Sequence, residues 1–421
     1  MSTFDANSSV YEVNRIMNSK IRNISEEIQD LLIKIRRDLH AIPELAFEEY
    51  QTSEMIISEL KKLKGMKIST GYAGGTGIIA TLCGKKGKSN QCVMIRADID
   101  ALPIEENNNL TYCSKEKGKM HACGHDAHIT WTLGAAMILT QLQESFSGTV
   151  KFVFQPAEEI AAGAKKMVEE KVLENPKVDI VLGAHGFPQY DTGKIIIPEK
   201  NAFSAARPLS IRVIGKGGHG SWPQDCVDPI AVANQIYMSL QQIISRKMKP
   251  SDASVLTIGS IHAGPTDKGN IIPNECILRG TLRHATLNGM ESMVQWVEEI
   301  SKHIAEANGA KVVVQCYHGV EPVINDKYYS KIFKKSSEEI VGKENVEMLE
   351  ESNLGGEDFY HYSQKVKSVY FFVGCAPKNK VGTFSLHSSN FCIDENILGT
   401  VAAVLSNTAI SFFMNNNIGG N

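Results

Sequence analysis

The stretch Met120-His121-Ala122-Cys123-Gly124-His125-Asp126-Ala127-His128 brings a thiol and three imidazoles into nine consecutive positions. Cys123 and His125 are two residues apart, so a helix would direct them to different faces, whereas a loop or a strand end can aim both at one ion. Thiolate and imidazole bind zinc and neighbouring divalent metals well, and a thiolate can bridge two ions. The stretch therefore predicts half of an open metal site. His121 and His128 are expected to be surface or supporting histidines, and Asp126 to cap the next helix or orient a ligand imidazole.

Short apolar runs bounded by glycines lie on both sides of this stretch and predict strands. They occupy residues 77–82, 92–95, 150–154, 178–182 and 195–197. Apolar residues recur at helical spacing at 24–39, 53–63, 130–142 and 164–173, and the first of these helices is expected to begin after Asn23 and Ser25 and to end before Pro43. This alternation predicts an α/β fold with a mainly parallel, twisted sheet and helices on both faces.

The pattern changes after about Ala205. Strands are predicted at 209–214, 255–258, 276–283 and 311–316, together with long amphipathic helices at 228–248 and 289–308. Two helices on one face of a sheet of about four strands make an α+β module, which we place as an inserted domain at residues 204–318. Residues 1–203 and 319–421 then form the metal-binding catalytic domain, because His387 would otherwise have no metal partners.

Further candidate metal residues follow other predicted strands, where open α/β sheets place their sites. Glu158 and Glu159 come after residues 150–154; one carboxylate can bind metal while the other faces the water to be activated, although a solvated acidic pair opening a helix is as common. His185 is expected at the end of strand 178–182, and His387 carries the same ambiguity between ligand and interior histidine. Asp98 and Asp100 lie on one side of the strand at 92–95, and we expect Asp100 to orient a ligand imidazole.

The inserted domain offers candidate substrate contacts. Its segment Gly215-Lys216-Gly217-Gly218-His219-Gly220-Ser221-Trp222-Pro223 is not a phosphate loop, because no helix with Lys-Ser/Thr opens behind the glycines. His219 is instead expected to donate to a developing oxyanion. Asn270 and Arg283 are candidates for gripping a carboxylate, against the plainer alternatives of a turn residue and an exposed strand charge. Outside the inserted domain, Gly355 and Gly356 offer an open loop for the substrate backbone.

Charge, hydropathy and cysteine content exclude several classes of partner and location. The net charge of −3 comes from interspersed signs, so no nucleic acid or membrane partner is expected. The apolar run at 402–413 is broken by Ser406, Asn407 and Ser411, and the polar first residues lack the order of a secretory signal. Nine scattered cysteines fit a reducing compartment, so a cytoplasmic location is expected.

Together these motifs are specific, and the chain resembles the metal-dependent aminoacylase/carboxypeptidase family. Within it the similarity is to hippurate hydrolases, N-acyl-amino-acid amidohydrolases and indole-acetyl-amino-acid conjugate hydrolases. It covers nearly the whole chain through RRDLHAIPEL (36–45), RADIDALP (96–103), CGHDAH (123–128), FQPAEE (154–159), GHGSWP (218–223) and LHSSNF (386–391).

The resemblance implies a di-metal exopeptidase-like fold with an inserted lid and dimerisation domain. It implies two divalent ions per subunit, zinc or manganese with cobalt as a further option, held by Cys123 between them and by His125, Glu159, His185 and His387. Glu158 is then the general base and acid. His219 would reach the site of the other subunit of a homodimer, and Asn270 would fix the substrate. The chain departs from the branch at Ile160-Ala161-Ala162, Trp222 and Gly356, which bears on pocket shape.

These features predict hydrolysis of the amide bond of an N-acyl amino acid, with a metal-activated water and Glu158 as base. The alternatives are a di-metal dipeptidase or carboxypeptidase acting on a short peptide and, from another class, a non-enzymatic protein that binds an amino-acid conjugate. A silent site of the last kind should lack the base, whereas Glu158 is present.

Overall fold

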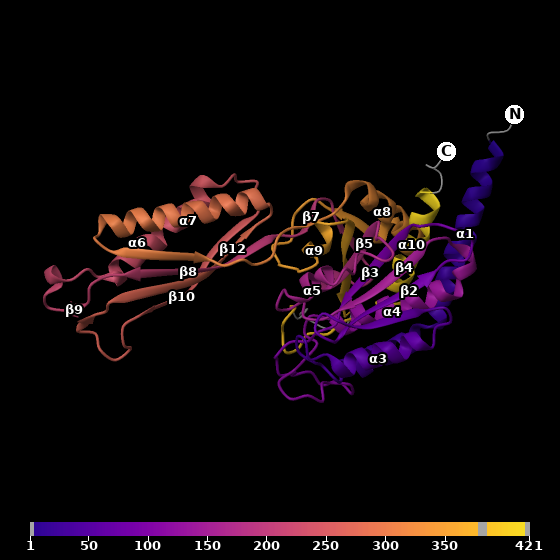
Figure 1. The fold of residues 1–421 in the computed structure, drawn as a ribbon, viewed down its shortest axis with the longest axis horizontal. Helices are drawn as coiled ribbons and strands as arrows, with labels where there is room; N and C mark the ends of the chain where they lie inside the picture. Colours follow the sequence, from indigo (N-terminus) through magenta and orange to yellow (C-terminus); the bar gives the residue numbers. More distant parts are fainter. Residues whose placement is uncertain (1–3, 378–384, 417–421) are drawn as a thin grey trace. The chain divides into compact units, whose positions relative to one another are not determined.

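The structure is a computed structural model that describes residues 4–377 and 385–416. The chain divides into two compact units, which are both visible in Figure 1. The first comprises Met1–Ala202, Ile324–Glu350 and Asp358–Asn421, and the second comprises Phe203–Val323 and Glu351–Glu357. The second unit thus includes a short segment, Glu351–Glu357, that lies outside the predicted 204–318. The Ser204 N–H donates to the Gly355 carbonyl (3.1 Å) and ties this segment to the unit.

The first unit is built on an eight-stranded sheet in the order β1-β2-β4-β3-β5-β16-β6-β15. Its parallel pairs are β3 with β4, β3 with β5, β5 with β16, and β6 with β15. The mainly parallel sheet predicted from the sequence is therefore confirmed. The strands are β1 (Lys67–Tyr72), β2 (Gly77–Cys83), β3 (Cys92–Asp98), β4 (Thr149–Gln155), β5 (Ile180–Asp191), β6 (Ile195–Pro198), β15 (Val346–Leu349) and β16 (Lys367–Ala376).

Helices cover both faces of this sheet, as predicted. Alternate residues of β3, Val93 and Ile95, share a buried core with Trp131 of α4 and with residues of α2, α8 and α10. On the opposite face Gly183 lies so close to Phe359, next to α9, that an added Cβ would come within 2.7 Å of its ring. The helices are α1 (Phe4–Glu27), α2 (Gln29–His40), α3 (Tyr50–Lys61), α4 (His125–Gln141), α5 (Gly163–Glu169), α8 (Lys327–Val341), α9 (Tyr360–Ser363) and α10 (Ile397–Asn416).

The predicted start of the first helix after Asn23 and Ser25 is wrong. Helix α1 already begins at Phe4, and the Ser25 hydroxyl donates to the Arg22 carbonyl (2.8 Å) instead of capping a helix N-terminus. The Ile28 N–H donates to the Ile24 carbonyl, so the backbone bonding continues from α1 towards α2. A polar residue whose side chain bonds back to its own helix does not mark a helix boundary.

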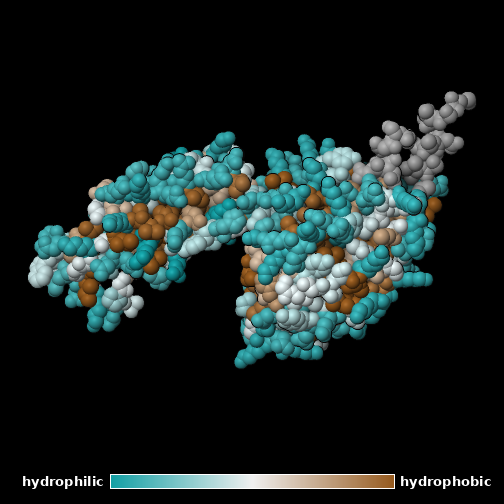
Figure 2. Space-filling model, in the orientation of Figure 1, coloured by the Kyte–Doolittle hydropathy of each residue, from teal (hydrophilic) through white to brown (hydrophobic). Residues whose placement is uncertain are grey.

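Among the described residues, one helical segment is long and apolar enough to cross a bilayer, Ile397–Met414 of α10, and 83% of it is buried inside the protein. Its polar side chains are hydrogen-bonded within the protein: the Ser406 hydroxyl donates to the Ala402 carbonyl of the same helix (2.8 Å), and the Asn407 amide donates to the Ser336 carbonyl of α8 (2.9 Å). This helix is therefore part of the core. Hydrophilic residues cover most of the surface visible in Figure 2.

The second unit is an antiparallel sheet in the order β10-β12-β8-β13, with α6 and α7 on one face (Figure 1). Buried residues of both helices, such as Ile236 and Met293, share a core with Ile211 and Leu278 of the sheet. A small two-stranded pair, β9 with β11, completes the unit. The elements are β8 (Ala205–Ile214), β9 (Gly218–His219), α6 (Pro229–Gln242), β10 (Ser254–Ala263), β11 (Ile271–Ile272), β12 (Glu275–His284), α7 (Leu287–Ala307) and β13 (Lys311–Cys316).

Candidate metal centre

Cys123 and His125 flank Gly124 at the start of α4. Gly124 has φ 86°, a left-handed conformation that favours glycine and turns the chain sharply between the two side chains. Cys123 Sγ lies 3.3 Å from Nε2 of His185, and the ligand atoms of Cys123, His125 and His185 all lie within 4.8 Å of one another. These three residues form one candidate ion position.

Cys123 also belongs to a second group, with Glu159 and His387, whose ligand atoms meet the same 4.8 Å limit. In this group Oε2 of Glu159 is 3.4 Å from Nε2 of His387. The structure thus brings all five proposed ligands into two groups of three that share one sulfur. A thiolate in this place can bridge two ions.

His125 is oriented by Asp100. Its Nδ1–H donates to the Asp100 carbonyl (2.9 Å) and lies 3.2 Å from the Asp100 carboxylate, which leaves Nε2 buried and without a hydrogen-bond partner among the described residues. Burial opposes the charged imidazole, but neighbouring carboxylates, Asp98 first among them, outweigh burial and raise the pKa of His125 to about 10. The surroundings of His125 therefore favour a positive charge.

Glu159, like His125, is held by Asp100 and has a buried ligand atom without a hydrogen-bond partner among the described residues. Its backbone N–H donates to the second Asp100 carboxylate oxygen (3.0 Å), and its own Oε1 is buried with no hydrogen-bond partner among the described residues.

Burial raises the pKa of the Cys123 thiol far above its usual value, and Glu159 and Glu158 raise it further. A bound cation would reverse this effect, because it stabilises the thiolate. The unpartnered atoms and the S, N and O donors fit divalent metal ions such as zinc.

His185 does not lie at a strand end, as the sequence suggested, but inside β5. This strand continues because it pairs with β16, where Phe372 is opposite His185. On its other side β5 pairs with β3 only as far as Gly183, opposite Arg96. His185 therefore lies beyond the end of β3, at the same edge as the other ligands.

Two other histidines of the opening stretch, His121 and His128, are buried, so of the two expected positions, surface or supporting, the surface is excluded. His128 bonds Asp98 through Nδ1 (2.5 Å) and accepts the Gly186 N–H at Nε2 (3.1 Å), so neither nitrogen is free for a metal. Burial lowers the pKa of His121 to about 3, and both of its nitrogens lack a hydrogen-bond partner among the described residues.

The Asp126 carboxylate accepts the Ala127 N–H (3.0 Å) in the first turn of α4, which is part of the capping role expected for it, but its main partners lie on another helix. Its carboxylate lies 2.8 Å from Nε of Arg36 and 2.7 Å from Nδ1 of His40, both on α2 and both fully buried. The helix begins at His125, two residues before Ala127, so Gly124 and not Asp126 stands at the N-cap position. Asp126 instead joins α4 to α2 through a buried ion pair.

Sequence reasoning missed a buried network beneath the site. Arg96 donates to Gln155 (2.8 Å), Asp98 (2.6 Å) and Asp358 (3.0 Å), and Asp358 also accepts the Ala164 N–H (2.9 Å). These bonds connect β3, β4, α5 and the segment before α9. The signal in the sequence was a pair of charged residues, two apart, at the end of a strand that is otherwise apolar.

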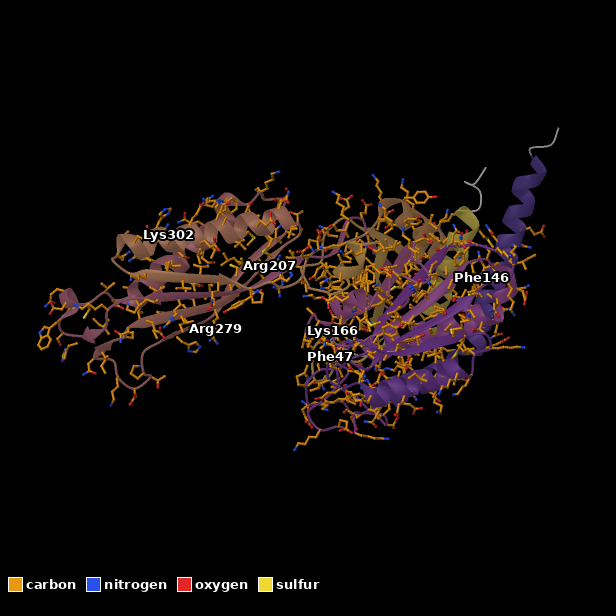
Figure 3. The ribbon with its side chains drawn as sticks, viewed as in Figure 1. Phe47, Phe146, Lys166, Arg207, Arg279 and Lys302 are labelled. Carbon is orange, nitrogen blue, oxygen red and sulfur yellow. The ribbon has the colours of Figure 1, made fainter. Side chains whose placement is uncertain are left out.

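Glu49 was missed as well. Its carboxylate accepts the Ala157 N–H (3.0 Å) and the Thr76 hydroxyl (2.8 Å), and burial raises its pKa to about 7. Ala157 has φ 56°, an uncommon conformation for a residue with a side chain, so Glu49 holds the turn just before Glu158. Nearby, Nζ of Lys166 lies 4.0 Å from the ring centre of Phe47, and the two labels adjoin in Figure 3.

The remaining candidates lie in the second unit. His219 ends β9, and its Nδ1 accepts the Ser221 N–H (3.1 Å), while the Gly220 N–H donates to the Asn270 carbonyl (2.9 Å). The ring of Trp222, a residue that is 58% exposed, lies 4.7 Å from the ring of His219. His219 and Asn270 are therefore close neighbours in this unit.

Arg283 lies in β12 and donates to the Thr281 hydroxyl and to the Leu282 carbonyl (3.2 Å), and partial burial lowers its pKa. Gly355 and Gly356 belong to the segment 351–357 of the second unit. A Cβ on Gly356 would lie 2.8 Å from Val320, so this backbone needs glycine for packing.

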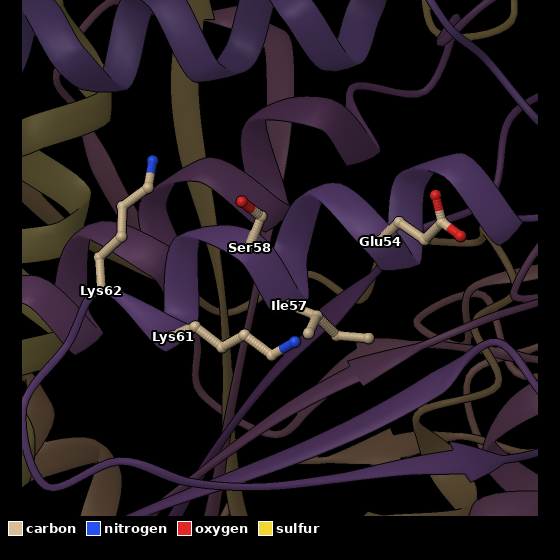
Figure 4. A pocket seen from close by; sticks show the side chains of 5 residues that line it. All are labelled: Glu54, Ile57, Ser58, Lys61 and Lys62. Atoms are coloured by element: carbon tan, nitrogen blue, oxygen red, sulfur yellow. The ribbon is translucent and has the colours of Figure 1, made fainter.

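A hollow of about 580 Å³ lies along the surface of α3 and contains none of the candidate residues (Figure 4). It is lined by Glu54, Ile57, Ser58, Lys61 and Lys62. Charged and polar side chains dominate it, so it does not compete with the metal centre.

Residues 94–411 match the model of peptidase family M20/M25/M40. The chain is 36% identical over 398 residues to thermostable carboxypeptidase 1 of Saccharolobus solfataricus, covering 93% of this chain and 98% of that protein. It is 34% identical over 379 residues to N-acetylcysteine deacetylase of Bacillus subtilis, covering 90% and 96%. A dinuclear metal-binding M20 peptidase from Bacillus subtilis has the same fold, with TM-score 0.79 and 31% identity, covering 92% of this chain and 99% of the other.

These matches agree with the sequence resemblance and with the donor groups around Cys123. Divalent metal ions are the cofactors that this family and this donor set imply. The chain belongs to peptidase family M20/M25/M40 and is a metal-dependent hydrolase of the amidohydrolase and peptidase type.

Proposed function

We propose that the protein hydrolyses the amide bond of N-acyl amino acids with two divalent ions, zinc or manganese, held by the five residues of the metal centre. The single observation that carries this proposal is the convergence of two three-residue donor groups on the Cys123 sulfur. Bound divalent ions supply Lewis-acid chemistry and make water acidic enough to attack near neutral pH. The nine free cysteines support a reducing, cytoplasmic location.

Glu158 is the proposed general base and acid. It lies beside Glu159, and its ligand atom is within 4.8 Å of those of His125 and Glu159, yet it is not needed for either group that shares Cys123. The Glu158 carboxylate takes a proton from water as the C–O bond forms, and returns it to the amine nitrogen as the C–N bond breaks. Proton transfer of this kind contributes about 10²–10⁴ in rate.

His219 is the proposed oxyanion donor. Because its Nδ1 accepts the Ser221 N–H, the neutral ring carries its proton on Nε2, which is then free to donate. Asn270 is the proposed substrate contact in the same unit, with Arg283, Gly355 and Gly356 as further candidates. His219 would serve the site of the partner in a homodimer formed through the second unit.

A peptidase role is the second candidate, since one relative is named a carboxypeptidase and another a deacetylase. We would measure kcat/KM for N-acetyl and N-benzoyl amino acids and for dipeptides, with zinc or manganese added. Preference for the N-acyl amino acids supports the proposal, whereas preference for dipeptides overturns it in favour of a dipeptidase or carboxypeptidase.

The base is tested with Glu158→Gln. This variant should bind metal as the wild type does but lose about 10²–10⁴ in kcat. Glu169→Gln, a change at an exposed glutamate of α5, is the control and should keep full turnover. Turnover retained by Glu158→Gln would remove Glu158 from the mechanism.

A further inference from the structure

The loop that carries His387 is held by a second loop more than 270 residues earlier in the chain. The Asn107 N–H donates to the Ser389 carbonyl (2.8 Å), and the Asn390 side chain donates to the Asn107 carbonyl (2.8 Å). The Asn108 side-chain amide donates to the Phe391 carbonyl (2.9 Å). The Asn107 side-chain amide also donates to the Ser389 hydroxyl (3.3 Å), so four hydrogen bonds tie residues 107–108 to residues 389–391.

His387 needs such support. Its φ is 63°, a left-handed conformation that is disfavoured for a residue with a side chain and persists only when the surroundings fix it. Its side chain is 52% exposed, so packing holds only half of it. Its N–H donates to the Ala122 carbonyl (2.9 Å), directly before Cys123. The direction of the imidazole is therefore set mainly by the backbone of its loop.

Asn108 is itself firmly anchored. Its amide also donates to Oε1 of Glu106 (3.0 Å), and the same Glu106 oxygen is 3.3 Å from Nε2 of the buried His40 on α2. The other Glu106 oxygen accepts the Ser114 N–H (2.7 Å). The Asn108 amide thus bridges a fixed carboxylate in the body of the first unit and the carbonyl of Phe391.

The candidate ion position formed by Cys123, His125 and His185 receives none of these bonds. Asp100 orients His125, and the Nδ1–H of His185 donates to the Gly186 carbonyl (2.9 Å). A change at residue 108 should therefore act on only one of the two positions.

We propose that Asn108 is a positioning residue for His387, and that its amide sets the affinity of the ion position formed by Cys123, Glu159 and His387 without affecting the position formed with His125 and His185. This inference rests on the two-ion site of the proposed function. It assigns a role in metal affinity to Asn108, a loop residue that is 283 positions away in sequence from its partner Phe391.

The test is a zinc titration of metal-free protein against a competing chelator, with bound zinc measured directly. In Asn108→Ala one of the two equivalents should weaken by about 10–100-fold, the usual cost of losing a residue that orients a ligand, while the other equivalent keeps its affinity. Asn108→Asp, which keeps the size but replaces the donor amide with a carboxylate, should show the same selective loss. Asn109→Ala changes an exposed neighbour with no side-chain hydrogen bond among the described residues and should match the wild type.

The route through His387 is tested in a double-mutant cycle. In the His387→Ala background, Asn108→Ala should cause no further loss of zinc affinity. Loss of both equivalents, unchanged affinity for both, or an additional loss in that background overturns the inference. Circular dichroism of the metal-free variants verifies that they are folded. A wild type that binds fewer than two equivalents would overturn the two-ion proposal itself, and this result differs from a wild type with two equivalents and an unaffected Asn108 variant.

Discussion

Replacing Asp100 with alanine should weaken both ion positions, because its carboxylate reaches a ligand in each. One oxygen lies 3.2 Å from Nδ1 of His125, and the other accepts the Glu159 N–H at 3.0 Å. This differs from the expectation for Asn108→Ala, which concerns a single position. Asp100→Ala therefore tests whether the two positions share a supporting group.

The expected loss of zinc affinity at each position depends on the contacts that its ligand keeps in Asp100→Ala. The His125 ring keeps the backbone carbonyl of residue 100 at 2.9 Å, so the loss at its position should be near the lower limit for an orienting residue, about tenfold or 1.4 kcal/mol. Glu159 loses a hydrogen bond to a charged group, worth about 1.5–3 kcal/mol, which corresponds to about 10–100-fold in affinity.

Chelator competition with zinc measures both affinities. Asp179→Ala is a matched control, because the Asp179 carboxylate accepts a backbone N–H of β3 (Cys92, 2.8 Å) at the opposite end of that strand. If Asp100→Ala binds both equivalents as tightly as the control does, Asp100 does not support the ligands and the reasoning from its contacts is refuted.

Three further outcomes are expected. Asp358→Ala deprives the buried Arg96 of a carboxylate partner and should lower the free energy of unfolding by about 3 kcal/mol in urea titrations, whereas an unchanged midpoint would contradict the role of this network. Glu49 has a folded-state pKa raised from 4.5 to about 7, so its contribution to stability is complete below pH 4.5 and is lost as the pH rises through 7. In metal-free protein, Glu49→Gln should remove this pH dependence and stabilise the fold at pH 8 by an amount on the order of 3 kcal/mol. If the melting temperatures of the wild type and of Glu49→Gln change with pH in the same way, Glu49 is not the source of the pH dependence. Removal of metal with EDTA should abolish turnover and lower the melting temperature, and added zinc or manganese should restore both, whereas full activity in EDTA would exclude a metal-dependent reaction.

Periodicity predicted the elements that place the site, because strand β3 and helix α4 have clear apolar patterns on either side of Cys123. It misplaced His185, since a strand continues as long as any neighbour pairs with it, and that depends on β16 far along the chain. The same limit applies to Asp358 and Asn108, whose partners are distant in sequence. Local pattern locates the ligands, but it does not reveal which remote residues hold them.

The five proposed ligands extend from Cys123 to His387, whereas most of the second unit is one continuous stretch, Phe203–Val323. On the ribosome, that stretch is complete before the last ligand has been synthesised. Incomplete chains that end before His387 should therefore contain a folded insertion but only part of the donor set, so hydrolytic capacity should arise only near the completion of translation.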